Sequence, residues 1–207
     1  VVVDADVLGR QRTGDETYVR NLLRELAPLA SEAGVRLAAV TRRPDLVPAG
    51  VEPVELTTRP QELRMALSLP RALRRLGADL VHTQYALPLR SPCPVVVTVH
   101  DLSFAREPGL MSRKDRLVFR RVVPRAVRGA ARVLTVSERT RADLVELYGV
   151  PEERVVLTPN GVDPAFHPAS HAGGEPGDYV LAVGAIQARK DQLAALDSDS
   201  RRHGTQG

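Results

Sequence analysis

Residues 94–101 read Pro-Val-Val-Val-Thr-Val-His-Asp, and this stretch indicates the class of fold. Positions 95–99 are all β-branched, so the segment favours a β-strand. Its consecutive valines place apolar side chains on both faces of that strand, which is typical of a parallel sheet covered by helices on both sides. The strand ends at a polar pair, His100 and Asp101.

Comparable short apolar runs recur along the chain, and segments with a helical period separate them. The alternation of strand and helix predicts an α/β fold with a doubly wound, mainly parallel, Rossmann-like sheet. The expected strands span residues 1–7, 35–41, 51–57, 78–83, 94–100, 132–137 and 154–158.

The first two expected helices differ in how they begin and continue. The spacing of Thr13 and Glu16 predicts a capping box at the start of the first. The second spans residues 61–76, where Pro70 is expected to kink or split it. The apolar positions are Val19, Leu22, Leu23, Leu26 and Leu29 in the first helix, and Leu63, Leu67, Leu73 and Leu76 in the second.

The third expected helix spans residues 112–128, contains Pro124 and carries many arginines around an apolar side. A basic amphipathic helix can lie on an anionic lipid surface, but we favour packing of this apolar side on the sheet of the chain itself. The fourth spans residues 138–148 and stops at Gly149, which is typical of a helix C-terminus.

The composition bounds the class of protein. The 207 residues are 43% hydrophobic and 26% charged, which is typical of a globular domain. The single cysteine, Cys93, excludes an internal disulfide and a cysteine-based zinc site. No apolar run approaches the length of a membrane span and no signal peptide is recognisable, so we expect a cytoplasmic protein.

The basic charge does not indicate a nucleic-acid partner. Among 29 basic residues only Lys114 and Lys190 are lysines, and such an arginine skew is explained more simply by coding bias. Aromatic residues make up 3% of the chain and tryptophan is absent, so the chain offers no stacking platform for single strands. We therefore expect no nucleic-acid binding.

The loop after the first expected strand contains Gly9 and Gly14, spaced as in a phosphate-binding loop. Asp15 and Glu16 stand where a lysine and a hydroxyl residue must follow, which excludes a P-loop. Gly14 at a helix N-terminus either presents N–H groups to an anionic ligand or only serves the geometry of the turn.

His100 follows the fifth expected strand, and ligands of open α/β sheets bind at the carboxyl ends of strands. An imidazole there can hydrogen-bond a substrate hydroxyl or share a proton near neutral pH. The alternative is a histidine that only caps the strand. For His82, which also stands at a strand end, we favour a structural role.

Arg189 and Lys190 come shortly after a further expected strand, 179–183, and before a helix expected to begin near residue 192. Two cations beside helix N–H groups suit a diphosphate. The spacing of histidines and carboxylates does not resemble a metal site, so we expect no metal cofactor.

In their order along the chain, these motifs resemble those of the family 4 glycosyltransferases, which are retaining enzymes of the GT-B fold, many of them mannosyl- or glucosyltransferases. The resemblance covers nearly all of residues 1–193. It is carried by the glycine loop at 14–23, the strand end at 97–101, Leu-Thr-Val-Ser-Glu-Arg-Thr at 134–140, Pro-Asn-Gly-Val-Asp at 159–163, and the segment 183–191.

The resemblance implies two Rossmann-like domains facing across a cleft, a nucleotide-sugar donor, a glycan or lipid-linked acceptor, and no metal. Gly14 would face the phosphate and sugar of the donor, and His100 would hydrogen-bond the transferred sugar. Arg189 and Lys190 would neutralise the departing diphosphate. A lipid-linked acceptor would bring peripheral contact with the inner face of the membrane. Further candidate site residues are Asp101, Ser137 and Asn160.

Two departures from the family pattern bear on activity. Ala185 stands where many members have an arginine, so the chain is closer to a variant with an adjacent Arg-Lys pair. The donor-site Glu-x7-Glu motif has no counterpart, since the last glutamate is Glu175. We expect a truncated chain that is inactive alone, with an acceptor-side domain at 1–164, a linker at 165–178, a stub of the donor domain at 179–196 and a disordered tail at 197–207.

Two other functions stay open on the sequence alone. One is a non-catalytic module of the same fold that binds a glycan, a lipid or a protein. The other is a sugar-nucleotide epimerase of the GT-B fold. The lack of a glutamate after Glu175 favours a loss of catalysis, whereas His100, Gly14 and the Arg-Lys pair favour transfer chemistry.

Overall fold

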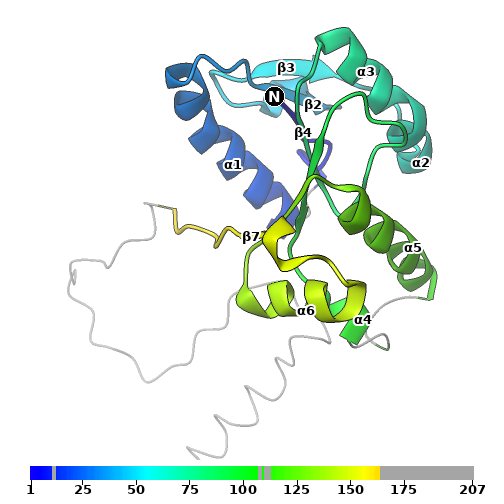
Figure 1. The fold of residues 1–207 in the computed structure, drawn as a ribbon. Coiled ribbons are helices and arrows are strands. Elements are labelled where there is room, and N and C mark those ends of the chain that lie inside the picture. Colours follow the sequence, from blue (N-terminus) through cyan, green and yellow to red (C-terminus); the bar gives the residue numbers. More distant parts are fainter. Residues whose placement is uncertain (11–12, 107–108, 110–112, 164–207) are drawn as a thin grey trace, which may run out of the picture.

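The computed structural model describes residues 1–10, 13–106, 109 and 113–163, and in this part of the chain seven parallel strands form one sheet (Figure 1). The strand order is β3-β2-β1-β4-β5-β6-β7. It changes direction between β1 and β4, which defines a doubly wound, Rossmann-like sheet. The strands are β1 (Val2–Asp4), β2 (Ala38–Thr41), β3 (Glu52–Glu55), β4 (Val81–Gln84), β5 (Val95–Val99), β6 (Arg132–Thr135) and β7 (Val155–Leu157).

The predicted α/β fold is therefore confirmed, and each strand overlaps its expected range. Most strands are shorter than expected, but β4 runs one residue further, to Gln84. The expected linker, domain stub and tail at 165–207 lie outside the described residues, and the boundary at residue 164 stays a prediction.

Helices cover both sides of the sheet. Figure 1 shows α1 on one side and α2, α3 and α5 on the other. None of the described helices combines the length and the apolar character that a bilayer span requires. The helices are α1 (Thr13–Glu32), α2 (Gln61–Leu63), α3 (Leu69–Leu76), α4 (Ser103–Arg106), α5 (Arg113–Gly129) and α6 (Glu138–Tyr148), with short 3₁₀ turns at Pro44–Leu46 and Glu152–Arg154.

Each side of the sheet has its own apolar core. The core under α1 is small, and it is formed by Val3, Ala5, Leu8, Val19, Leu23, Ala27, Leu37, Ala39 and Val51. The core on the other side is larger and joins α3, α5 and α6 to alternate residues of β4 and β5, such as Val81, Val97 and Val99. The central strand β5 is thus covered on both faces, as its valine run predicted, whereas the edge strand β7 leaves Val156 41% exposed.

The apolar stripe predicted for α1 is only partly correct. Val19 and Leu23 are buried, but Leu29 is 58% exposed and Ala27 is buried near the end of the helix instead. Glu16 accepts a hydrogen bond from the backbone N–H of Gly9 at 3.0 Å and one from Arg20. The side chain of Thr13, the other half of the expected capping box, lies outside the described part.

The apolar face predicted for the second helix is wrong at its start. Leu63 and Leu67 are 45% and 43% exposed, whereas Arg64, Met65 and Leu69 are buried. The cause is a π-helical turn, Arg64–Ser68, in which the N–H of Leu69 donates to the carbonyl of Arg64. One extra residue in this turn rotates the following helix relative to an α-helical register.

The predicted break at Pro70 is consistent with this turn. Proline has no N–H to donate to the carbonyl four residues earlier, so the regular ladder is interrupted near this position. The π turn ends at Ser68, and Pro70 is the second residue of α3. α3 then continues to a left-handed Gly77, with φ of 59°.

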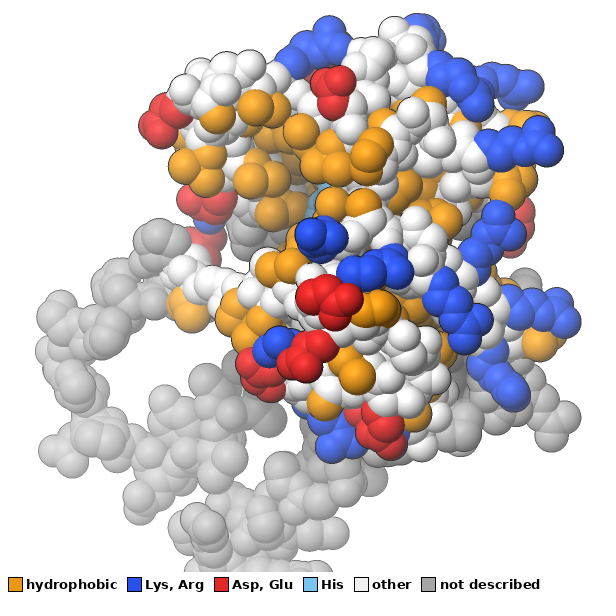
Figure 2. Space-filling view, in the orientation of Figure 1, with side chains coloured by type: hydrophobic (Ala, Val, Ile, Leu, Met, Phe, Trp, Pro, Cys, Tyr) orange, Lys and Arg blue, Asp and Glu red, His pale blue; other side chains and the backbone are white. Residues whose placement is uncertain are grey.

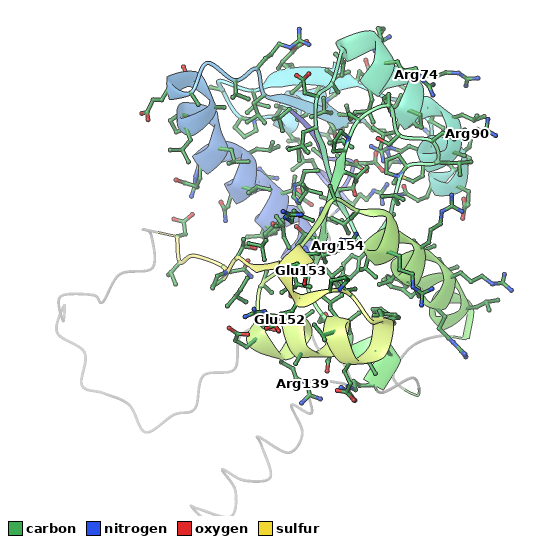
Figure 3. The ribbon with its side chains drawn as sticks, in the orientation of Figure 1. Arg74, Arg90, Arg139, Glu152, Glu153 and Arg154 are labelled. Carbon is green, nitrogen blue, oxygen red and sulfur yellow. The ribbon has the colours of Figure 1, made fainter. Side chains whose placement is uncertain are left out.

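Two helix ends agree well with prediction. α6 has the predicted bounds, starts with the Ser137 hydroxyl accepting from the N–H of Thr140 at 3.2 Å, and stops at Gly149 with φ of 62°. At the end of α5, Arg154, labelled in Figure 3, donates to the carbonyls of Val127 and Arg128. A cation at the carbonyl end of a helix favours this packing.

Candidate functional site

The expected site residue His100 comes directly after β5, at the carboxyl edge of the sheet. β5 is hydrogen-bonded to β4, and Gln84 stands opposite Thr98. Residues two apart on a strand share a face. His82 and Gln84 on β4 therefore lie on the same side as Thr98 on β5 and His100 directly after it, and we call these four residues the polar array.

Two hydrogen bonds join the strands within the polar array. Nε2 of His82 lies 2.7 Å from Oγ1 of Thr98, and Nε2 of His100 lies 2.8 Å from Oε1 of Gln84. An unpaired polar group at such a buried place costs about 1–3 kcal/mol. The paired arrangement avoids that cost and holds both imidazole rings.

Tyr18 on α1 covers the polar array. The rings of Tyr18 and His100 pack edge to face, with centroids 4.5 Å apart and planes at 82°. The Tyr18 hydroxyl lies 3.2 Å from Oγ1 of Thr98. Burial raises the pKa of Tyr18, so this hydroxyl stays protonated at neutral pH. Tyr18 thus fixes the plane of the His100 ring, and the sequence analysis missed it.

Both imidazoles are neutral near pH 7. Burial lowers the pKa of His82 to about 4. Burial also lowers the pKa of His100 from its ordinary value of 6.5, and the carboxylates of Asp15 and Asp101 offset only part of that shift. His100 therefore offers one N–H donor and one nitrogen acceptor, and it can bind a hydroxyl without carrying charge.

Asp101 has a local structural role. Its Oδ1 accepts from the backbone N–H of Ser103 at 3.0 Å and from the Ser103 hydroxyl at 2.7 Å, which caps α4. The backbone N–H of Asp101 donates to the Tyr85 hydroxyl at 3.3 Å. Tyr85 has φ of 57°, an uncommon value for a residue with a side chain, and its ring centroid lies 5.7 Å from that of His100.

Ser137 is likewise occupied by the fold, because its hydroxyl caps α6. Thr140 of the same turn donates its hydroxyl to the carbonyl of His100 at 3.2 Å. The cap of α6 therefore supports the backbone at His100. We read both Ser137 and Asp101 as residues that shape the site.

A pocket of about 780 Å³ lies between α1 and the segment that follows β7. It brings together two expected site residues, Gly14 and Asn160, which are far apart in the sequence. Tyr18 also lines this pocket and touches His100, so it connects the pocket with the polar array. The lining residues are Gly14, Thr17, Tyr18, Asn21, Leu22, Arg24, Glu25, Thr158, Pro159, Asn160, Gly161, Val162 and Asp163.

The backbone geometry of Gly14 does not require a glycine. Its φ lies outside the left-handed region, and a Cβ built on it would meet no atom within 4 Å. The turn-geometry explanation for Gly14 therefore has no support here. A glycine at the exposed first turn of α1, beside a pocket, leaves room for a ligand to approach the backbone N–H groups.

The other expected cations, Arg189 and Lys190, lie outside the described residues. Among the residues that the structure describes, no cluster of three histidine, cysteine or carboxylate side chains could hold a metal ion.

A buried charge network at the same edge of the sheet was not foreseen. Arg64 is fully buried and donates from Nη1 to Oδ2 of Asp4 at 2.7 Å, and its Nε lies 3.8 Å from Asp6. Asp6 also pairs with Arg10 and Arg42. The π turn points Arg64 inward, and periodicity alone gives no signal for such a turn.

The fold is a doubly wound α/β domain, with a polar cluster and a pocket at the carboxyl edge of its sheet as the candidate ligand site. The family model for Glycosyltransferase Family 4 matches residues 12–166, which is most of the chain. The chain belongs to glycosyltransferase family 4.

Comparisons with solved structures and with curated protein sequences give less. The chain is similar to the crystal structure of a glycosyltransferase from Rickettsia africae ESF-5, with 17% sequence identity and a TM-score of 0.46. That match covers 81% of this chain and 45% of the other, so the chain spans less than half the length of that glycosyltransferase. No curated protein sequence matches the chain significantly.

Proposed function

We propose that this domain forms one wall of the active site of a retaining enzyme that transfers a hexosyl group, mannosyl being one candidate, from a nucleotide sugar to a glycan or lipid-linked acceptor. The observation that carries the proposal is the neutral, hydrogen-bonded His100 beside Tyr18, which also lines the pocket that holds Gly14 and Asn160. Membership of family 4 supports the class of reaction.

In the proposed reaction the bond between the anomeric carbon and the diphosphate oxygen breaks, and a bond forms between that carbon and an acceptor hydroxyl oxygen. The hydroxyl proton leaves to a base, and negative charge collects on the diphosphate. Groups already oriented toward the developing charge lower the barrier. Gly14, in the first turn of α1, lines the pocket, and Arg189 with Lys190 would add cations. We expect no metal in this site.

His100 would hold the sugar during transfer. A half-buried neutral imidazole can bind a hydroxyl at fixed geometry, and its ring is already held by Gln84 and Tyr18. Little ordering is then needed when the sugar binds, which favours the reacting geometry.

A contact with a membrane surface is part of the proposal for a lipid-linked acceptor. In α5, Val123 and Val127 are buried, so part of the apolar side packs on the sheet as favoured above, but Leu117 and Val118 are 54% and 45% exposed. Figure 2 shows basic side chains, which in the described part of the chain are arginines, along the side formed by α3 and α5, with apolar surface between them. Co-sedimentation with vesicles containing anionic lipid, compared with neutral vesicles, tests this contact. Equal recovery with both would contradict it.

Donor binding is the first test. We expect that a millimolar nucleotide sugar shifts the NMR signals of the Gly14 amide and the His100 ring in the ¹⁵N-labelled chain. His100→Ala should weaken binding, whereas the control Gln61→Leu, at an exposed side chain of α2, should not. Titration with uridine and guanosine diphosphate sugars that leaves both signals in place contradicts the proposal.

Turnover is the second test. In an active enzyme containing this domain, His100→Ala should lower kcat about 10²-fold or more with the fold intact. The prediction that these 207 residues alone do not transfer sugar is checked by calorimetric titration and a transfer assay. Micromolar donor affinity or measurable transfer would show that prediction to be wrong.

A further inference from the structure

The polar array also places a glutamine against the candidate substrate-binding imidazole. Gln84 is the last residue of β4, and His100 follows β5, so both side chains leave the sheet at its carboxyl edge. Oε1 of Gln84 lies 2.8 Å from Nε2 of His100. An amide oxygen only accepts hydrogen bonds, so the His100 nitrogen in this bond carries the proton.

The other ring nitrogen is then left as an acceptor. Among the described residues, no hydrogen bond reaches Nδ1 of His100. A neutral imidazole holds one proton, so a proton on Nε2 leaves a lone pair on Nδ1. Tyr18 packs edge-on against the ring and limits its rotation.

The neighbouring pair has no such preference. His82 bonds to the Thr98 hydroxyl, which can donate or accept, so that contact allows either tautomer. The sequence thus places an amide beside the half-buried imidazole of His100 and a hydroxyl beside the buried imidazole of His82. Thr98 also meets the Tyr18 hydroxyl at 3.2 Å, so the whole array is connected.

We propose that Gln84 is a positioning residue that holds His100 in the Nε2–H tautomer, which leaves Nδ1 to accept a hydrogen bond from a hydroxyl group of the substrate. This inference rests on the proposed function for the identity of the substrate as a sugar. It adds a specificity rule, because Nδ1 accepts from a hydroxyl and repels an acceptor such as a phosphate oxygen or a fluorine.

The tautomer is measured without any substrate. Two-bond ¹H–¹⁵N correlation spectra of the histidine-labelled chain at pH 8 distinguish protonated from unprotonated ring nitrogens, and His100→Ala assigns the signals. We expect Nε2 of His100 to be protonated in the wild type. Gln84→Leu should reduce the ratio of the two tautomers about five-fold. Gln84→Glu, whose carboxylate only accepts, should keep the wild-type pattern.

Gln61→Leu is the matched control, because Gln61 is an exposed glutamine on α2 and should leave the His100 signals in place. A wild-type Nδ1–H tautomer overturns the proposal. An unchanged ratio in a folded Gln84→Leu variant does so as well. If that variant does not fold, the tautomer of His100 in the wild-type and Gln84→Glu spectra still tests the proposal.

The second part of the proposal, that Nδ1 accepts from a substrate hydroxyl, is tested with nucleotide sugars in which each sugar hydroxyl in turn is replaced by fluorine. One analogue should bind at least five-fold more weakly to the wild type, with no difference for His100→Ala. Equal affinity of all analogues for the wild type overturns this part. If no nucleotide sugar binds at all, the proposed function fails while the tautomer result stands by itself.

Discussion

The two faces of strands β4 and β5 carry different kinds of interaction. On the α3 and α5 side, Val81, Val97 and Val99 are fully buried in the larger apolar core. On the α1 side, the intervening residues form the polar array, joined by hydrogen bonds. Alternation along a strand lets the same residues stabilise the fold on one face and build the site on the other.

The difference between the faces shows how the candidate site is kept rigid. The apolar face gains stability from burial, which has no direction. The polar face gains little net stability from its hydrogen bonds, but each bond fixes an orientation. Substitutions on the apolar face should therefore change mainly the free energy of unfolding, whereas substitutions on the polar face should also change the orientation of the imidazole rings.

The largest expected loss of stability lies in the buried ion pair at the carboxyl edge. Among the described residues, Asp4→Ala leaves Asp6 as the one carboxylate paired with the fully buried guanidinium of Arg64, so we expect about 3–5 kcal/mol of destabilisation. The double variant Asp4→Leu with Arg64→Met should lose less than Asp4→Ala. Urea unfolding measures both, and a cost below about 1 kcal/mol for Asp4→Ala would contradict this view of the pair.

The polar array should make stability depend on pH. His82 has a pKa of about 4 in the folded chain, below its ordinary value of 6.5, so the unfolded chain binds the proton more readily. The free energy of unfolding therefore has its full value above pH 6.5 and falls as the pH drops toward 4. The total loss from His82 is on the order of 3 kcal/mol. Unfolding curves of wild type and His82→Gln should therefore converge at low pH. Parallel curves would argue against a buried neutral His82.

Neighbouring residues on opposite faces give a direct comparison. Val97→Ala removes apolar contacts and should cost about 2 kcal/mol in the free energy of unfolding without moving the His100 ring signals. Thr98→Val should cost a comparable 1–3 kcal/mol, because it leaves His82 and Tyr18 without their shared partner. Only Thr98→Val should shift the ring signals, and Thr98→Ser should restore them. Identical spectra for all three variants would remove the distinction between the faces.

The smallest expected effect on stability is at Gly14. Gly14→Ala should leave stability unchanged or raise it by up to about 1 kcal/mol, because the site is open and helical. It should nevertheless weaken donor binding. The matched control is Gly149→Ala, where φ of 62° makes a side chain costly by about 1 kcal/mol. Thermal melting of both variants checks this pair, and a clear loss of stability in Gly14→Ala would return Gly14 to a structural role.

The sequence was sufficient where local chemistry determines structure. Short apolar runs located the seven strands of the described residues, and Gly149 marked the end of α6 because helix termination depends on nearby residues. Leu63 and Leu67 were misplaced because one extra residue in the π turn changes which face is buried. A prediction that assumes 3.6 residues per turn throughout does not include this extra residue and assigns the wrong face.

The sequence predicted where the candidate site lies but not all of the residues that form it. His100 was predicted to stand at the carboxyl end of a strand, and the structure places it directly after β5. Tyr18 and Gln84 were missed because their roles depend on which elements pack together. One signal was available for Gln84, since it stands two positions after His82, as His100 stands two positions after Thr98, and residues two apart share a face of a strand.

The π turn at Arg64–Ser68 has a consequence for insertions and deletions. Removing one residue there, for example Ala66, would allow continuous α-helical bonding before Pro70 and shift every earlier side chain by one helical position. Arg64 would then turn away from Asp4 and lose its buried partner. Any alignment with a chain that has a regular helix here must place a one-residue gap within this turn.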